Sequence, residues 1–335
     1  MKKENIYETM ENDVLNANLD EAEKSKLLKN IMRLKDKNVN IMITGATGCG
    51  KSSTINALFD MEVAKVGVGV DPETMDIEKY ELNNLTLWDT PGLGDGKEAD
   101  NRHAKNIIKK LAEVDENGDA LIDLVLVILD GGTRDLGTSY ELINSVIIPN
   151  LGEDKKNRIL VAINQADVAM KGRYWDYEKN EPMDKLKEFL DNKVISVKNR
   201  IKEATGVDIE PIYYSAGFKE EGEEQSRPYN LSKLLYYIVK ATPTEKRAVY
   251  VNNTNEDENM WRDNDDLLDY GEETRKSIMD SVVEGASRGV DVGGDIGGEI
   301  GGIFGKTGER IGRAVGSVVG GVIGAVGGFI GGFFS

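Results

Sequence analysis

Nine residues, GATGCGKSS at positions 45–53, combine three glycines, one lysine and two serines. They follow the apolar run VNIMIT and precede TINALF, so a glycine-rich loop joins an expected strand to an expected helix. Glycines let the backbone curl so that successive N–H groups point toward one anion. The lysine adds positive charge, and the start of a helix directs its own positive end to the same place. The stretch therefore predicts a loop that binds phosphate groups.

The loop matches the pattern G-x-x-x-x-G-K-[ST] of nucleotide-binding loops. In this pattern Lys51 places its charge on the β- and γ-phosphate oxygens, and the Ser52 hydroxyl can coordinate Mg²⁺. An incidental glycine turn is the alternative, and the flanking strand and helix argue against it. We expect nucleotide contacts from the whole loop, which comprises Gly45, Ala46, Thr47, Gly48, Cys49, Gly50, Lys51, Ser52 and Ser53.

A second stretch, WDTPGLGDG, directly follows another expected strand. Asp89, at the strand end, is suited to hold Mg²⁺ through water, and Gly92 can bring a backbone N–H onto a γ-phosphate. Between the two motifs lies VGVGVDPETMDIEKY, in which the Thr74 hydroxyl can close over Mg²⁺ and the γ-phosphate; an ordinary loop threonine is the alternative. The expected metal ligands are Ser52, Thr74 and Asp89, and the expected catalytic groups are Lys51, Thr74 and Gly92.

Two more stretches, NQAD and YSAG, each end an apolar run. A carboxylate at Asp167 can accept hydrogen bonds from the N1–H and the 2-amino group of guanine. Adenine has no such donor pair and would leave the carboxylate unpaired, at about 1–3 kcal/mol. Asn164 can tie the base to the phosphate loop, and the small Ala216, beside Ser215, lets a backbone N–H approach the guanine oxygen. The motifs therefore predict GTP or GDP as the ligand, with Mg²⁺.

The elements that position these motifs follow from the apolar pattern of residues 38–245. The runs NVNIMITG, LTLWD, LVLVILD, RILVAIN and EPIYYSAG are typical of strands buried on both faces. Helical spacing is found between and after them, at 51–59, 98–113, 138–147, 183–204 and 229–240. This alternation predicts an α/β fold with a doubly wound, mostly parallel sheet, and it places every motif at the end of a strand, where such folds bind ligands.

The segments on either side of this domain have different patterns. Residues 1–37 predict two amphipathic helices, the second starting at Asp20 with Glu23 three residues on; they either pack on the domain or form a partner-binding arm. Residues 246–281 are acidic, and we expect a solvated linker with a short helix near 264–283.

Residues 282–335 hold 19 of the 37 glycines and none of the seven prolines. The glycines recur at every fourth residue from 285 to 305 and again from 308 to 332. In water such a helix loses about 1 kcal/mol per glycine relative to alanine, whereas in a membrane the spacing makes a flat ridge for helix packing. The last 22 residues, 314–335, carry no charge, and Lys306, Arg310 and Arg313 precede them. The segment predicts a glycine-zipper tail that associates with a membrane.

Two alternatives stay open for the tail. It can be a glycine-packed helical hairpin docked on the protein or on a second copy, or a disordered, aggregation-prone segment.

With these motifs in place, residues 38–245 resemble the GTPase domain of the Era-like group of P-loop GTPases, in the TRAFAC class. GATGCGKSSTINALF and DTPGLGDG also resemble septins and immunity-related GTPases. Overall the chain is similar to the bacterial YfjP-like family labelled 50S ribosome-binding GTPase. Members of that family carry a leading helix, a threonine in the position of Thr74 and a hydrophobic C-terminal region. The resemblance implies hydrolysis of GTP to GDP and phosphate.

The chain departs from the pattern at two positions. The usual N-K-x-D is N-Q-A-D here, so Gln165 lacks the lysine stem that lies along the base. Leu93 stands where many GTPases have a glutamine that orients the attacking water. We therefore expect slow intrinsic hydrolysis, with acceleration from Arg134 or from a homodimer through the GTPase domains. A surface position is the simpler expectation for Arg134 and for the only histidine, His103.

The amino-acid composition limits which classes of molecule the protein can bind. The net charge of −17 disfavours broad binding to nucleic acid, and the single cysteine excludes an intrachain disulfide. The N-terminal stretch lacks the apolar core of a signal peptide, which predicts a cytoplasmic protein, associated with a membrane through the tail. We expect a nucleotide switch coupled to the tail; the alternatives are a ribosome- or RNA-associated assembly GTPase and a pore-forming protein gated by the GTPase domain.

Overall fold

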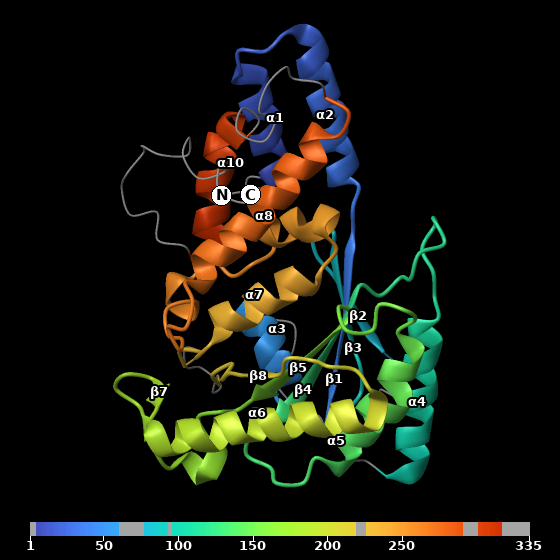
Figure 1. The fold of residues 1–335 in the computed structure, drawn as a ribbon, viewed down its shortest axis with the longest axis vertical. Coiled ribbons are helices and arrows are strands. Elements are labelled where there is room, and N and C mark those ends of the chain that lie inside the picture. The colour runs from blue at the N-terminus through green and yellow to red at the C-terminus, as the bar shows by residue number, and fades with distance from the viewer. Residues whose placement is uncertain (1–4, 60–76, 93–95, 219–225, 291–300, 317–335) are drawn as a thin grey trace.

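A computed structural model describes residues 5–59, 77–92, 96–218, 226–290 and 301–316. The molecule has two tiers (Figure 1). A sheet flanked by helices forms the lower tier in this view, and four helices from both ends of the sequence, α1, α2, α8 and α10, form the upper one.

The sheet has six strands in the order β2-β3-β1-β4-β5-β8. Every neighbouring pair is parallel except β2 and β3, so the doubly wound, mostly parallel sheet is confirmed. The edge strand β2 is rich in charge and was not among the expected strands. The strands are β1 (Val39–Gly45), β2 (Glu78–Glu81), β3 (Leu85–Asp89), β4 (Leu124–Asp130), β5 (Ile159–Asn164) and β8 (Ile212–Tyr213), and a separate small hairpin pairs β6 (Trp175–Asp176) with β7 (Glu181–Pro182).

Helices cover both faces of the sheet because successive residues of the central strands point to opposite sides. In β4, Leu124, Leu126 and Ile128 enter one hydrophobic core, and Val125, Val127 and Leu129 enter the other. The helices of this tier are α3 (Lys51–Phe59), α4 (Lys97–Leu111), α5 (Gly137–Glu141), which continues as a π-helix through Ile147, α6 (Asp184–Thr205) and α7 (Leu231–Ala241).

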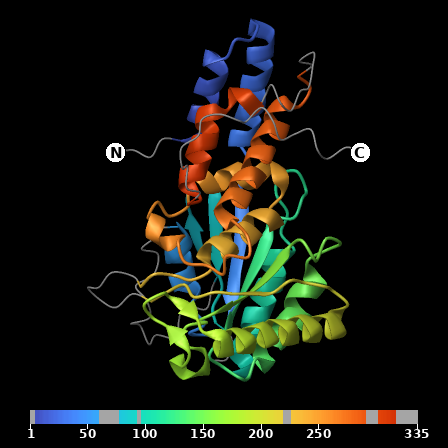
Figure 2. The same ribbon diagram turned by 60° about the vertical axis from the view of Figure 1, so that its left-hand side comes forward.

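The upper tier holds α1 (Ile6–Asn16), α2 (Glu21–Lys35), α8 (Tyr270–Ser287) and α10 (Gly305–Ala314). The expected start of α2 is present as a capping box: Asp20 accepts the Glu23 N–H, and the Glu23 carboxylate accepts the Asp20 N–H. In both views α10 lies beside α1 and α8 (Figures 1 and 2). The leading helices thus pack on the protein, which is the simpler of the two readings for them.

Of the two features expected at 246–281, the short helix is present as α8, whereas the solvated linker is wrong. A 3₁₀-helix at Thr244–Asn252, a short one at Glu258–Met260 and helix α8 fill this segment. Ala248, Val249, Tyr250 and Val251 are buried in the core that also holds α1 and α7. The sequence pattern did not predict this packing because acidic residues predominate in the segment. A few large apolar side chains between them, such as Trp261, are buried and determine the packing.

The described residues of the glycine-rich segment pack on the protein, whereas the hairpin itself stays a prediction because residues 291–300 lie outside the described residues. A Cβ atom at Gly285 would lie 2.6 Å from Leu34 Cδ2, and one at Gly316 would lie 2.6 Å from Trp261 Cβ. These glycines therefore permit close packing against protein side chains. Among the residues that the structure describes, no helix is both long enough and apolar enough to cross a lipid bilayer. Most of the uncharged run 314–335, which is expected to associate with a membrane, lies outside those residues.

Candidate nucleotide-binding site

The predicted motifs meet at one edge of the sheet. Gly45 ends β1, Asp89 ends β3 and Asn164 ends β5. These strands are parallel, so their carboxyl ends lie side by side. Strand β1 enters from the helical tier, and this edge therefore lies on the side of the sheet away from that tier (Figure 1).

Glycine is required at two positions of the phosphate loop. A Cβ atom at Gly45 would lie 2.2 Å from the Ile128 carbonyl oxygen, and one at Gly50 would lie 2.2 Å from Asn164 Nδ2. Gly50 also has a φ of +89°, which residues with a side chain rarely adopt. The loop is thus pressed against β4 and against the base-binding motif at the same time. This leaves a backbone cradle of the kind that holds phosphate.

Lys51 and Ser52 form the first turn of α3, directly after the loop. The Lys51 ammonium group donates to the carbonyl oxygens of Gly45 and Ala46, at 3.4 and 3.3 Å. It therefore lies over the loop, where phosphate oxygens would take over its hydrogen bonds. The side chains of Ser52 and Ser53 are half-buried at the same helix start.

The Asp89 carboxylate has the properties of a cation ligand. Its Oδ1 atom is buried and has no hydrogen-bond partner among the described residues. Burial raises the pKa of Asp89 to about 6, although the positive charge of Lys51 acts in the opposite direction. When the carboxylate is ionised, its negative charge is therefore poorly compensated. Mg²⁺ fits this site because it prefers carboxylate, hydroxyl and phosphate oxygens.

Gly92 approaches the phosphate loop closely. A Cβ atom there would lie 2.2 Å from Thr47 Oγ1 and 2.6 Å from the Thr47 backbone nitrogen. The loop that follows β3 is thereby held against the phosphate loop. Beside it, the Thr90 hydroxyl donates to Thr44 Oγ1 at 2.8 Å, which ties β3 to β1.

Asn164 joins the phosphate loop to the base-binding loops. Its Nδ2 donates to the Cys49 carbonyl oxygen and its Oδ1 accepts the Ala216 N–H, both at 2.9 Å. Gln165 also reaches the phosphate loop, since its Nε2 donates to the Gly48 carbonyl oxygen at 2.9 Å. The expected tie by Asn164 is therefore present. The Ala216 N–H itself is bonded to Asn164, and the expected approach of a backbone N–H to the guanine oxygen stays a prediction.

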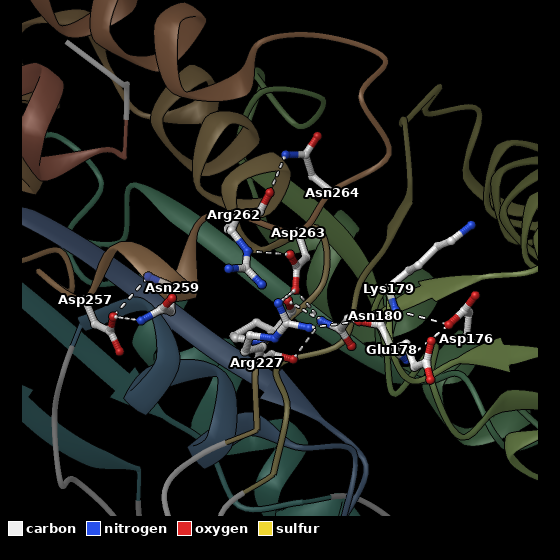
Figure 3. Close-up of polar contacts among 11 residues, drawn as sticks. Asp176, Glu178, Lys179, Asn180, Arg227, Asp257, Asn259, Arg262, Asp263 and Asn264 are labelled. Atoms are coloured by element: carbon white, nitrogen blue, oxygen red, sulfur yellow. Dashed lines mark hydrogen bonds and ion pairs between the residues drawn. The ribbon is translucent and has the colours of Figure 1, made fainter. Parts of the chain in front are cut away.

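The remaining base-binding residues lie in the same place. Asp167 is half-buried just beyond β5, and Ser215 pairs with Tyr229 through two backbone hydrogen bonds of 3.0 and 2.9 Å. Figure 3 shows the polar contacts that hold the chain before Tyr229. Asn180 donates to the carbonyl oxygens of Arg227 and Pro228 and to Asp263, at 3.1, 3.0 and 2.9 Å. The hairpin at 175–182 thus supports the loop that follows β8.

Two positioning contacts were not foreseen. The Thr54 hydroxyl in α3 bonds the buried Tyr214 hydroxyl at 2.7 Å, which links the phosphate-binding helix to the base-binding strand. Lys193 in α6 donates to the carbonyl oxygens of Asp130, Gly131 and Thr133, at 3.1, 2.8 and 2.7 Å. The sequence has no signal for either, since each joins residues more than 50 positions apart.

Four other expected residues have different outcomes. Thr74 and Leu93 lie outside the described residues. Arg134 is exposed on the loop after β4, as expected. The expectation of a surface His103 is wrong, because its side chain is 4% exposed. His103, Ile107 and Leu111 are four residues apart in α4 and share the face that packs on the core.

A phosphate loop, a strand-end aspartate, an Asn-x-x-Asp motif and a Ser-Ala loop, gathered at the carboxyl edge of a mostly parallel sheet, define a P-loop GTPase domain. Residues 40–165 match the family model described as 50S ribosome-binding GTPase.

The chain is similar to two uncharacterised proteins of Escherichia coli. It is 31% identical to YfjP over 148 residues, which cover 43% of this chain and 47% of YfjP. It is 30% identical to YkfA over 157 residues, which cover 46% of this chain and 50% of YkfA. The chain thus spans about half the length of these curated relatives.

Among solved structures, Toc33 from Arabidopsis thaliana is similar at 18% identity and a TM-score of 0.44, over 72% of this chain and 97% of Toc33. The fold assignment rests on the strand order above.

Proposed function

We propose that the protein binds GTP and GDP with Mg²⁺ and hydrolyses GTP slowly. The observation that carries this proposal is the double hydrogen bond of Asn164, which joins the phosphate loop to the loop after β8. Base recognition and phosphate recognition are then parts of one site. Asp167 follows Asn164 by three residues, in the place from which a carboxylate reads the guanine edge.

The residues of the chain have separate roles in this proposal. Lys51 and the N-terminal end of α3 neutralise the β- and γ-phosphates, and the Gly92 N–H adds a donor to the γ-phosphate. Ser52, Asp89 and Thr74 hold Mg²⁺. The metal supplies positive charge to the phosphate oxygens. Phosphate oxygens and water would complete the ligand set of the metal, as is usual for Mg²⁺.

Slow hydrolysis follows from Leu93, which cannot orient a water molecule. A residue from a second GTPase domain, or Arg134, would raise the rate. The uncharged run 314–335 supports a further proposal, that the tail associates with the cytoplasmic face of a membrane and that the nucleotide state controls this association.

Binding of fluorescent guanine nucleotides, with and without Mg²⁺, tests the central proposal. Asp167→Asn should weaken GTP binding by about a hundredfold and favour xanthine nucleotides, because an amide can donate to the oxygen that replaces the 2-amino group. The matched control is Asp119→Asn, an exposed aspartate in a loop beyond α4, which should bind like the wild type. If Asp167→Asn keeps wild-type affinity and base preference, the proposed reading of the base is wrong.

A further inference from the structure

Residues Asn252–Asn255, here called the polar hub, are four consecutive polar side chains with exposed fractions between 1% and 6%. Buried polar groups need hydrogen-bond partners, and each of these finds its partners in a different element. Asn252 accepts the Ile6 N–H at the start of α1, at 2.8 Å. Asn253 exchanges two hydrogen bonds with the backbone of Asn83, in the turn between β2 and β3.

The fourth residue of the hub holds the end of the phosphate-binding helix. The Asn255 N–H donates to the Leu58 carbonyl oxygen at 2.9 Å, and its Nδ2 donates to the Ala57 carbonyl oxygen at 3.1 Å. These carbonyls belong to the last described turn of α3, where Asn255 satisfies them from outside the helix. The other end of α3 begins at Lys51. One nine-residue helix therefore connects the phosphate site to the hub.

The third residue of the hub holds α10. The Thr254 hydroxyl donates to the Ala314 carbonyl oxygen at 2.9 Å. Trp261, against which Gly316 packs, donates through Nε1 to the Asn255 carbonyl oxygen at 2.9 Å. Neighbouring residues of the hub thus bond the ends of α3 and of α10.

Near its other end α10 is held by α1. Asp13, which is 8% exposed, accepts the Thr307 N–H and the Thr307 hydroxyl through one oxygen, at 2.9 and 2.8 Å. The face of α10 and its flanks that packs on the protein carries Phe304, Ile311 and Val315, all at most 1% exposed. The helix also carries the cations Lys306, Arg310 and Arg313 against the single anion Glu309. A basic helix with one apolar face suits an anionic lipid surface, but here the protein covers that face.

We propose that the polar hub couples the nucleotide at one end of α3 to the docking of α10, and that undocked α10 binds an anionic lipid surface. This inference rests on the proposed function as a guanine-nucleotide switch. Docking and lipid binding use the same apolar face and exclude each other. Coupling is reciprocal, so any change that undocks α10 also changes nucleotide affinity.

Hydrogen exchange of the backbone amides in 304–315, measured on the full chain with GDP and with a non-hydrolysable GTP analogue, tests the coupling. We expect rates that differ by about fivefold or more between the two nucleotides. In Asn255→Ala the difference should fall below about twofold. The matched control is Asn253→Ala, the same change two residues away, which leaves α3 and α10 bonded and should keep the difference. If Asn255→Ala does not fold, Thr254→Val, which removes one hydrogen bond to α10, takes its place.

Flotation with vesicles tests the lipid surface. Asp13→Ala should bind phosphatidylserine vesicles about tenfold more than the wild type, in either nucleotide state, and phosphatidylcholine vesicles much less. Asp20→Ala, which removes a helix cap from the same pair of helices and leaves Thr307 bonded, should behave like the wild type. Equal binding of Asp13→Ala and the wild type would overturn the lipid part of the inference.

Nucleotide titration of the same samples distinguishes a failure of the proposed function from a failure of the proposed coupling. A wild-type protein that binds neither nucleotide contradicts the proposed function itself. A protein that binds both nucleotides and shows equal exchange in α10 leaves the GTPase proposal intact and refutes only the coupling.

Discussion

The two ends of α3 lie in polar surroundings of opposite kinds. At the phosphate end, the Lys51 ammonium makes only contacts of 3.3 and 3.4 Å, and Asp89 Oδ1 has no partner among the described residues. At the polar hub, the side-chain hydrogen bonds of Asn252–Asn255 are 2.7 to 3.2 Å long and reach four elements. A buried polar group without partners loses about 1–3 kcal/mol of stabilisation, so the phosphate end retains a deficit that a ligand can satisfy.

This difference separates a binding site from a structural cluster. Substitutions at the phosphate end should act mainly on ligand affinity, and removing a poorly compensated charge there should leave stability unchanged or improved. A substitution at Asn252, the hub residue that bonds the start of α1 and neither α3 nor α10, should act mainly on stability. The following substitutions test whether ligand affinity and stability depend on different ends of α3.

The largest effect is expected from Gly50→Ala. The new Cβ atom would lie 2.2 Å from Asn164 Nδ2, at a φ of +89°, so the phosphate loop must shift. We expect nucleotide affinity to fall by at least about a hundredfold in a fluorescence titration. Gly118→Ala is the control, because Gly118 has a φ of +84° with no atom near its Cβ position. It should lose about 1 kcal/mol of stability and no affinity. If Gly50→Ala and Gly118→Ala lose the same affinity, backbone strain and not the clash with Asn164 explains the loss.

At the hub, Asn252→Ala should lower the free energy of unfolding by about 1–3 kcal/mol. The change leaves the Ile6 N–H, at 2.8 Å from Asn252 Oδ1, buried without its acceptor. Urea unfolding measures the loss, and the affinity for nucleotide should stay within about twofold. Asn16→Ala, which removes an exposed amide that bonds only the Asn12 carbonyl oxygen, should change stability little. If Asn252→Ala has normal stability and reduced nucleotide affinity, the proposed difference between the two ends of α3 is wrong.

Asp89→Asn should change affinity and stability in opposite directions. The amide cannot offer a charge to Mg²⁺, so we expect the stimulation of nucleotide binding by Mg²⁺ to fall about tenfold. Without nucleotide, removing a buried and poorly compensated charge should raise the free energy of unfolding by about 1 kcal/mol. Asp130→Asn is the control, because Asp130 also ends a strand but accepts the Gly132 N–H at 2.7 Å. Asp130→Asn should not alter the Mg²⁺ dependence; a loss there as well would point to a general effect of charge.

The same division explains how much the sequence could predict. The five mutually parallel strands and the phosphate loop have local signals, namely apolar runs and glycines at fixed spacing, and were found where expected, whereas the charged edge strand β2 has no apolar run. Asn164 could be placed because its motif has a known geometry. Its bond to the Ala216 N–H could not, since the loop conformation depends on Tyr229 and on the hairpin at 175–182.

The features that the sequence did not predict depend on contacts between residues far apart in the chain. Four consecutive polar residues, Asn252–Asn255, are typical of a solvated turn, and only the three-dimensional structure shows a partner for each. His103 looked exposed among charged neighbours, yet its spacing with Ile107 places it on the buried face of α4. Sequence patterns describe local preference well and give no account of partners more than 100 positions away.

The smallest effect concerns Cys49, the only cysteine, which lies in the phosphate loop. Burial raises the pKa of its thiol to about 11, and the positive charge of Lys51 opposes this. A raised pKa means less thiolate at a given pH, so alkylation by iodoacetamide at pH 8 should be about a hundredfold slower than for a free cysteine. The rate, followed by mass spectrometry, should rise about tenfold per pH unit from 8 to 10. Lys51→Ala should slow alkylation further, because it removes the charge that favours the thiolate. A plateau below pH 9 would show instead that the positive charge of Lys51 outweighs the effect of burial on the pKa of the Cys49 thiol.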